Sequence, residues 1–165
     1  MNTKKIPPIV IGSDRVIAYA IVDKSVKFSG KKRLFIEGNL LGEVPNVAIC
    51  KSLNKELKDY LILYCDKKWS MLGVAGAPTF SEAVKEAERC YQGIAKKFVR
   101  TGNSEKIARR WMAEKYPEAV CNFCGRMYFE VDTLVEGRAA VICSACIKDL
   151  AMNLHLMDYS LDENS

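Results

Sequence analysis

The stretch CNFCGRMYFEVDTLVEGRAAVICSACIKDL, residues 121–150, decides the fold of the last third of this 165-residue chain. It holds two CxxC pairs separated by 18 residues, in a chain with a single histidine. Two residues between cysteines let both thiolates face one ion, and two such pairs complete the tetrahedral shell that zinc prefers. Gly125 supplies the backbone freedom of a tight knuckle. The pattern predicts one structural Zn²⁺ held by Cys121, Cys124, Cys143 and Cys146.

Other uses of paired cysteines fit this spacing less well. Thioredoxin-type redox chemistry needs one CxxC at a strand-to-helix junction of a βαβ unit rather than two matched pairs. Iron–sulfur ligation is a further alternative, but the two-plus-two spacing matches zinc knuckles better. A catalytic zinc is disfavoured because four cysteines leave no open coordination position. His155 is therefore expected at a surface or interface rather than in the metal shell.

The other cysteines, Cys50, Cys65 and Cys90, lie in apolar segments, and the total of 7 is odd. Secreted disulfide frameworks usually have even counts in short, loop-rich chains, so the three are expected to be small core residues. The N-terminus is interrupted by Pro7 and Pro8, and no apolar run approaches the roughly 18 residues of a membrane helix. We expect a cytoplasmic protein without a membrane segment.

The order of residues around the cysteines carries a family resemblance. "CNFCGR" opens the segment, Glu130, Val131, Leu134 and Gly137 follow, and "ICSACI" closes it at residues 142–147. This succession resembles the C4 zinc-binding domain of the ClpX substrate-unfolding ATPase. In that family the finger is a compact, treble-clef-like unit that dimerises and docks substrates and adaptors. The resemblance covers about residues 121–150 and implies a recognition finger, which we expect to occupy residues 119–158.

The chain also departs from that family. No GxxxxGK[ST] phosphate loop occurs in the sequence, so the chain is not predicted to be the unfoldase. The segment 127–129 (MYF) is more apolar than its counterpart in ClpX, so we expect it to pack against the N-terminal domain or a partner. The following helix has two apolar stripes. One, predicted to cover the knuckles, is Ile147, Leu150, Ala151 and Leu154; the other is Met152, Leu156 and Tyr159. The last residues, 159–165, are expected to be disordered.

The N-terminal part predicts a small α+β domain over residues 8–100. Short β-rich runs over residues 16–72, including a hairpin in "LFIEGNLLGEV", indicate an antiparallel β-meander. A helix capped by Thr79 with Glu82 should cover one face of the sheet. A second helix, within a connecting segment at 101–118, is predicted to end at Pro117. The segment "GVAGAP" at 73–78 is interpreted as a connecting loop, and Trp69 as a core or edge-strand aromatic.

Charge divides the chain where the cysteine-rich segment begins. Residues 1–120 contain 22 Lys and Arg against 13 Asp and Glu, whereas residues 121–165 contain 3 against 7. The basic residues are scattered along the sequence, which favours a solvated surface over a nucleic-acid-binding patch.

No catalytic constellation is recognisable around the one histidine, so we do not predict an enzyme. The predicted function is protein recognition, as an adaptor, regulator or assembly factor whose finger supports homodimerisation or docks a protein partner. The alternatives are a nucleic-acid-binding zinc protein and an immunity-type inhibitor of a toxin.

Overall fold

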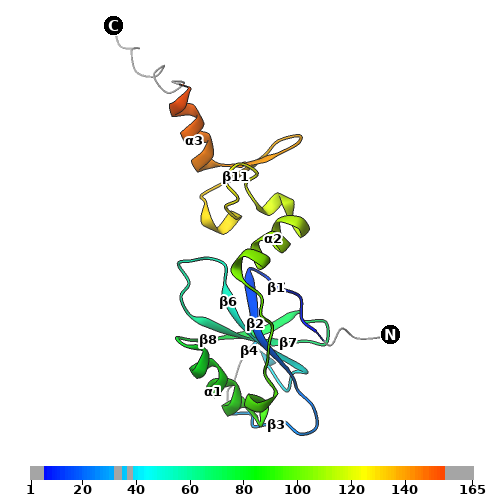
Figure 1. Cartoon of the computed structure of the whole chain (residues 1–165). Helices are drawn as coiled ribbons and strands as arrows, with labels where there is room; N and C mark the ends of the chain where they lie inside the picture. Colours follow the sequence, from blue (N-terminus) through cyan, green and yellow to red (C-terminus); the bar gives the residue numbers. More distant parts are fainter. Residues whose placement is uncertain (1–5, 32–34, 37–38, 155–165) are drawn as a thin grey trace. The chain divides into compact units, whose positions relative to one another are not determined.

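The computed structural model describes residues 6–31, 35–36 and 39–154, and the side chains of 6–31 and 40–154 (Figure 1). The chain divides into two compact units, Met1–Arg109 and Arg110–Ser165. The boundary lies within helix α2 (Glu105–Lys115), in the segment predicted to connect two domains. The α+β class predicted from the sequence is confirmed, with an antiparallel sheet in the first unit and a cysteine cluster in the second.

The first unit is built on one antiparallel sheet with the order β1-β2-β6-β7-β8, in which β10 also pairs with β2. The strands are β1 (Val10–Ile11), β2 (Asp14–Ile21), β6 (Asn46–Ser52), β7 (Tyr60–Cys65), β8 (Met71–Ala77) and β10 (Val99–Arg100). Strands β6, β7 and β8 follow one another in the chain and in the sheet, which is the predicted meander.

Strands that follow β2 and precede β6 in the chain pair outside this sheet, contrary to a continuous meander. Strand β3 (Lys27–Phe28) pairs with β9 (Tyr91–Gln92), and β4 (Phe35–Ile36) forms the predicted hairpin with β5 (Asn39–Leu40). Tyr91 explains the first pairing, because its ring lies 5.1 Å from that of Phe28 and its hydroxyl accepts from the backbone N–H of Val44 at 3.0 Å. Such contacts are distant in sequence, so strand propensity alone does not reveal them.

Helix α1 (Phe80–Cys90) covers one face of the sheet, as predicted (Figure 1). The core between them contains the following side chains: Ala20, Val47, Ile49, Ile62, Tyr64, Ala75, Ala77, Ala83, Ala87 and Cys90. The prediction of a loop at 73–78 is wrong, because β8 continues to Ala77. The small side chains of Ala75 and Ala77 are buried in this core, where they leave room for the helix.

A second core lies on the opposite face, because successive residues of a strand alternate between faces. Cys50, Cys65 and Trp69 are buried there, and the Trp69 ring meets that of Tyr19 edge-on at 5.7 Å. Cys90 belongs to the first core. The assignment of these three cysteines and of Trp69 to the interior is therefore confirmed.

The second unit contains short elements around the cysteines. The 3₁₀ turns are Pro117–Ala119 and Tyr128–Glu130, and a further one, Ile94–Lys97, belongs to the first unit. Strand β11 (Leu134–Glu136) pairs with β12 (Val141–Cys143), and α3 (Ser144–Asn153) follows at once. Among the described residues, no helix has the length and apolar character needed to cross a membrane.

Candidate metal centre

The first two cysteines lie on a knuckle closed by backbone hydrogen bonds. The N–H of Cys121 donates to the carbonyl of Arg126 at 2.8 Å, and the N–H of Gly125 donates to the carbonyl of Cys121 at 2.9 Å. Gly125 has a φ of 72°, a conformation that side chains disfavour. The glycine therefore has the role that the sequence predicted for it.

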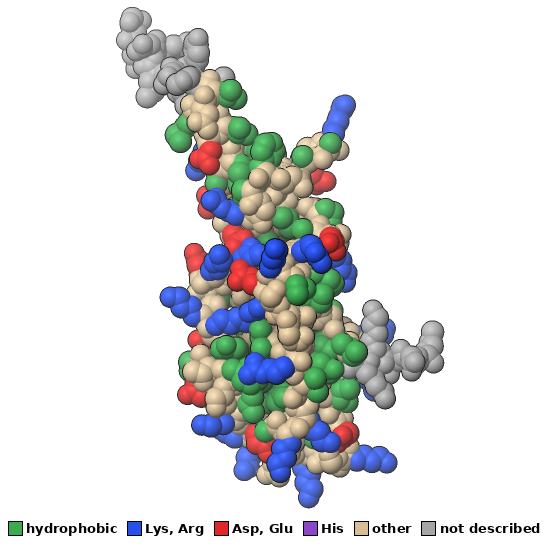
Figure 2. Space-filling model, viewed as in Figure 1, with side chains coloured by type: hydrophobic (Ala, Val, Ile, Leu, Met, Phe, Trp, Pro, Cys, Tyr) green, Lys and Arg blue, Asp and Glu red, His purple; other side chains and the backbone are tan. Residues whose placement is uncertain are grey.

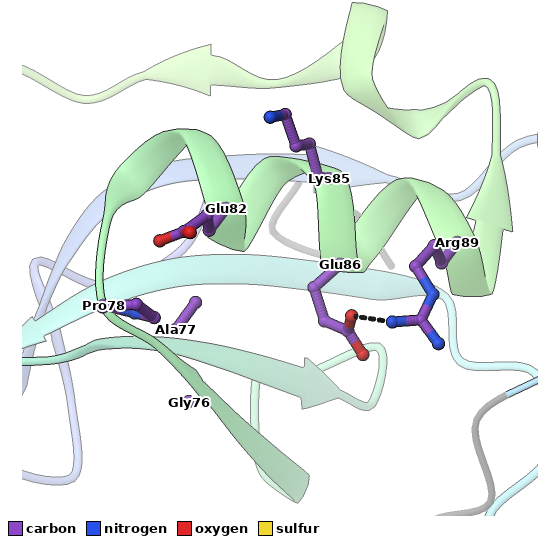
Figure 3. Close-up of a pocket in the computed structure, with 7 residues that line it drawn as sticks. All are labelled: Gly76, Ala77, Pro78, Glu82, Lys85, Glu86 and Arg89. Atoms are coloured by element: carbon purple, nitrogen blue, oxygen red, sulfur yellow. Dashed lines mark hydrogen bonds and ion pairs between the residues drawn. The ribbon is translucent and has the colours of Figure 1, made fainter.

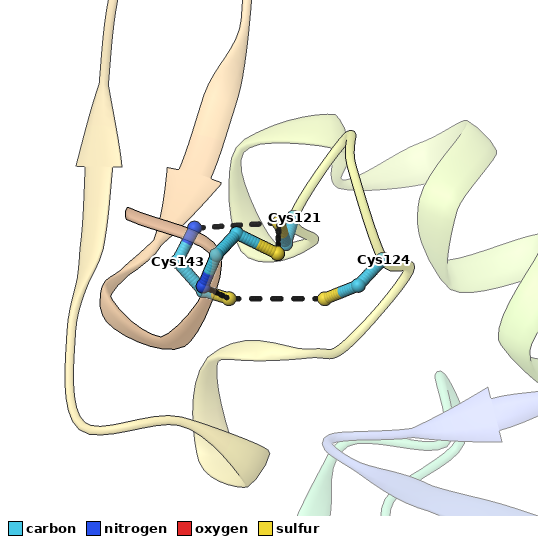
Figure 4. Close-up of side chains that lie close together, drawn as sticks. Cys121, Cys124 and Cys143 are labelled. Carbon is cyan, nitrogen blue, oxygen red and sulfur yellow. Dashed lines mark hydrogen bonds between the residues drawn. The ribbon is translucent and has the colours of Figure 1, made fainter. Parts of the chain in front are cut away.

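The second pair lies where β12 runs into α3. Cys143 is the last residue of β12 and also the N-cap of α3, where its sulfur accepts from the N–H of Cys146 at 3.4 Å. The knuckle, the β11–β12 hairpin and the junction of β12 with α3 together form the predicted treble-clef-like arrangement. Figure 4 shows three of the cysteines, Cys121, Cys124 and Cys143, facing one another.

Asn122 joins the two halves of the site. Its side-chain oxygen accepts from the N–H of Val141 at 2.5 Å, and its own N–H donates to the carbonyl of Val141 at 2.8 Å. Val141 begins the strand that ends at Cys143. This pair of hydrogen bonds therefore fixes the position of the first knuckle relative to the second. Sequence reasoning missed Asn122, although a short polar side chain within a CxxC is a signal for local bonding to the backbone.

The four sulfurs fit a zinc ion. All of them lie within 4.8 Å of one another, with 3.9 Å between Cys121 and Cys146 and 3.7 Å between Cys124 and Cys143. A tetrahedral shell with Zn–S bonds of about 2.3 Å has sulfur–sulfur edges of about 3.8 Å. The chain therefore forms the predicted site for one structural Zn²⁺.

Electrostatics also favour a cation here. Burial raises the pKa of the Cys121 thiol, but backbone N–H groups of Cys124, Cys143 and Phe123 outweigh it and lower that pKa to about 6. Hydrogen bonding to Cys124, followed by burial, raises the pKa of Cys146 to about 12. Four thiolates at such short separations repel one another, so some of the sulfurs keep a proton in the absence of a cation. A bound metal ion neutralises this repulsion and lets all four be thiolates.

One expectation about the finger needs correction. The stripe predicted to cover the knuckles is largely exposed: α3 buries no residue, and Ile147 and Leu150 are 40% and 39% exposed. Within the MYF segment Met127 is buried and forms a bridge with Val120, whereas Tyr128 is exposed. The knuckles are held by backbone bonds instead. His155, Leu156, Tyr159 and the expected tail at 159–165 lie outside the described residues.

A pocket of the first unit offers no comparable centre. It has a volume of about 310 Å³ and lies beside α1 (Figure 3), lined by Gly76, Ala77, Pro78, Glu82, Lys85, Glu86 and Arg89. Glu86 pairs with Arg89 at 2.9 Å, and Glu82 accepts from the Thr79 hydroxyl at 2.9 Å. The acidic and basic side chains balance, so the pocket has no net preference for a charged ligand.

Comparison with known proteins agrees with the geometry of the second unit. Neither a curated protein nor a solved structure gives a significant match to the chain. One family does match: residues 119–152 fit the ClpX C4-type zinc finger, and this segment contains all four clustered cysteines.

Proposed function

We propose that the chain is a non-catalytic protein-interaction protein, an adaptor, regulator or assembly factor, whose zinc finger supports dimerisation or docks a partner. The observation that carries the proposal is the exposed apolar surface of the finger. Its large apolar side chains with more than a third of their surface exposed are Phe123, Tyr128, Val135, Ile147, Leu150, Met152 and Leu154. Each Å² of such surface that a partner covers contributes roughly 25 cal/mol.

The metal site supports a structural role for the ion. Four sulfur ligands fill the tetrahedral shell, so no position is left for a water or a substrate. Four cysteines that serve as zinc ligands must stay as thiolates, which a reducing compartment favours, so we propose a cytoplasmic location.

The test removes apolar surface from α3 without touching the metal ligands. We expect the double variant Ile147→Asp/Leu150→Asp to retain one zinc and its fold, since both side chains are already about 40% exposed. It should lose the self-association or the captured partner that wild type shows in sedimentation and in affinity capture with mass spectrometry.

The control is Asn153→Asp, which adds a negative charge to an exposed position of the same helix and removes no apolar surface. This variant should behave as wild type. Equal sedimentation and identical partners for wild type and the double variant would remove α3 from the interface.

A further inference from the structure

A second pocket in the first unit collects positive charge. It has a volume of about 240 Å³ and lies where β2, β6, the β6–β7 loop and the first residue of α2 meet. Its lining residues are Arg15, Lys51, Ser52, Asn54, Lys55, Leu57, Lys58 and Glu105. Figure 2 shows Lys and Arg side chains over the visible face of the molecule, with Asp and Glu side chains among them. Residues that are scattered in the sequence therefore converge on one place.

The single carboxylate of the pocket is already engaged. Glu105 accepts from Nε of Arg109 at 2.8 Å, and the same guanidinium donates to the carbonyl of Leu53 at 3.0 Å. The negative charge of Glu105 is thus compensated by a cation that does not line the pocket. Four lining cations remain without a compensating carboxylate in the lining.

The sheet places two of the cations at opposite positions on neighbouring strands. Arg15 and Lys51 are direct partners in the register of β2 and β6, and like charges in this position destabilise a strand pair. Neither forms an ion pair within the described residues: Arg15 donates to the carbonyl of Asn103 at 3.1 Å, and Lys51 lies 4.6 Å from the ring centre of Tyr60 and donates to the carbonyl of Lys58. An anion between them would relieve this repulsion.

The other two cations, Lys55 and Lys58, are exposed on the β6–β7 loop. In the part of the chain that the structure describes, their ammonium groups have no hydrogen-bond or ion-pair partner. The loop itself is ordered, because Asn54 donates its N–H to the hydroxyl of Ser52 at 3.2 Å and its side chain accepts from the N–H of Glu56 at 3.0 Å. The two ammonium groups are therefore available at the rim of a defined pocket.

We propose that this pocket binds the terminal phosphate group of a small molecule. Such a group carries a charge of about −1.5 to −2 at neutral pH and three strong acceptor oxygens, which suit one guanidinium and several ammonium groups. The pocket is smaller than the roughly 300–1,000 Å³ of typical organic ligand sites, so it takes a phosphate with few further atoms. A nucleic-acid strand instead requires cations spaced along a groove, whereas these four converge.

The experiment titrates the full-length, zinc-loaded protein with pyrophosphate at constant ionic strength and follows backbone amides by NMR. We expect saturable shifts confined to the residues around Arg15 and the β6–β7 loop. A single-stranded oligothymidylate without terminal phosphates, at the same phosphate concentration, should leave these amides nearly unchanged.

The variant Lys55→Ala/Lys58→Ala should weaken pyrophosphate binding roughly tenfold or more, because two charge-assisted contacts are lost. Lys67→Ala/Lys68→Ala, which removes the same charge from the exposed β7–β8 turn, should bind as wild type. The proposal is overturned if pyrophosphate produces no saturable shift, if both double variants weaken binding equally, or if only the oligonucleotide binds.

Discussion

Asp23 is an exposed carboxylate whose hydrogen bonds favour its ionised form. Hydrogen bonds from the Ser25 hydroxyl, from Lys97 Nζ at 2.9 Å and from the Ser25 N–H lower the pKa of Asp23 from 3.8 to about 2. A carboxyl group whose pKa is lowered by folding stabilises the native state at pH values above its unfolded pKa of about 3.8. This contribution to stability is lost as the pH falls through the folded pKa of about 2.

We therefore expect the Asp23 carboxyl carbon to titrate near pH 2 by NMR. In Asp23→Asn the corresponding part of the acid-dependent loss of stability should vanish. Lys97→Gln is the matched control, and it should raise the pKa only in part because both Ser25 bonds remain. A midpoint near 4 in wild type would contradict this account.

At the scale of the element, α1 depends on its first turn. Thr79 accepts the N–H of Glu82 on its hydroxyl oxygen at 3.2 Å and donates the hydroxyl hydrogen to the Glu82 carboxylate at 2.9 Å. Loss of an N-cap costs about 1 kcal/mol. Thr79→Ala should lower the free energy of unfolding of the first unit by about this amount in urea. Ser81→Ala, at the neighbouring exposed position, should change it by much less.

Local patterns identified the elements whose contacts are local. Three predicted features depend only on residues that are neighbours in sequence. They are the cap and apolar spacing of α1, the helix that ends before Pro117, and the paired cysteines at 121–124 and 143–146. The cap of α1 and the metal site needed no knowledge of the rest of the chain.

Elements held by distant partners were not predictable in the same way. Strand β8 was missed beyond Leu72 because its glycines and alanines have low strand propensity, and the packing of Ala75 and Ala77 under α1 overrides it. The basic pocket was not predictable from the sequence, because Arg15 and Lys51 become neighbours only through the register of β2 and β6. The alternation of apolar and polar residues along a strand indicates which side chains face the core, but it does not identify the strand that pairs with it.

At the scale of the whole molecule, the metal should support the second unit and not the first. Structural zinc contributes on the order of 10 kcal/mol in small fingers, because binding and folding are coupled. A strong chelator at neutral pH should therefore unfold the second unit, while the sheet of the first unit, which contains none of the clustered cysteines, stays folded.

The chain's 2 tryptophans make this measurable, since Trp69 lies in the first unit and Trp111 in the second. In Trp111→Phe, emission from buried Trp69 should not respond to the chelator, whereas wild type should show the response of Trp111. Metal analysis should give one equivalent for wild type and for Cys90→Ala, and a loss for Cys121→Ser. If the chelator removed no metal and left the thermal unfolding curve unchanged, the assignment of a structural zinc ion to the second unit would be contradicted.

The burial of the cysteines has a consequence for chemical labelling. Burial raises the pKa of Cys50 and brings that of Cys65 to about 12, so these thiols stay protonated and inaccessible at neutral pH. Alkylation of the native chain is therefore confined to the 4 clustered sulfurs, and zinc shields those while it is bound. The other cysteines of the 7 become reactive only when the sheet opens. The mass added to each molecule by an alkylating reagent thus records which of the two units had unfolded.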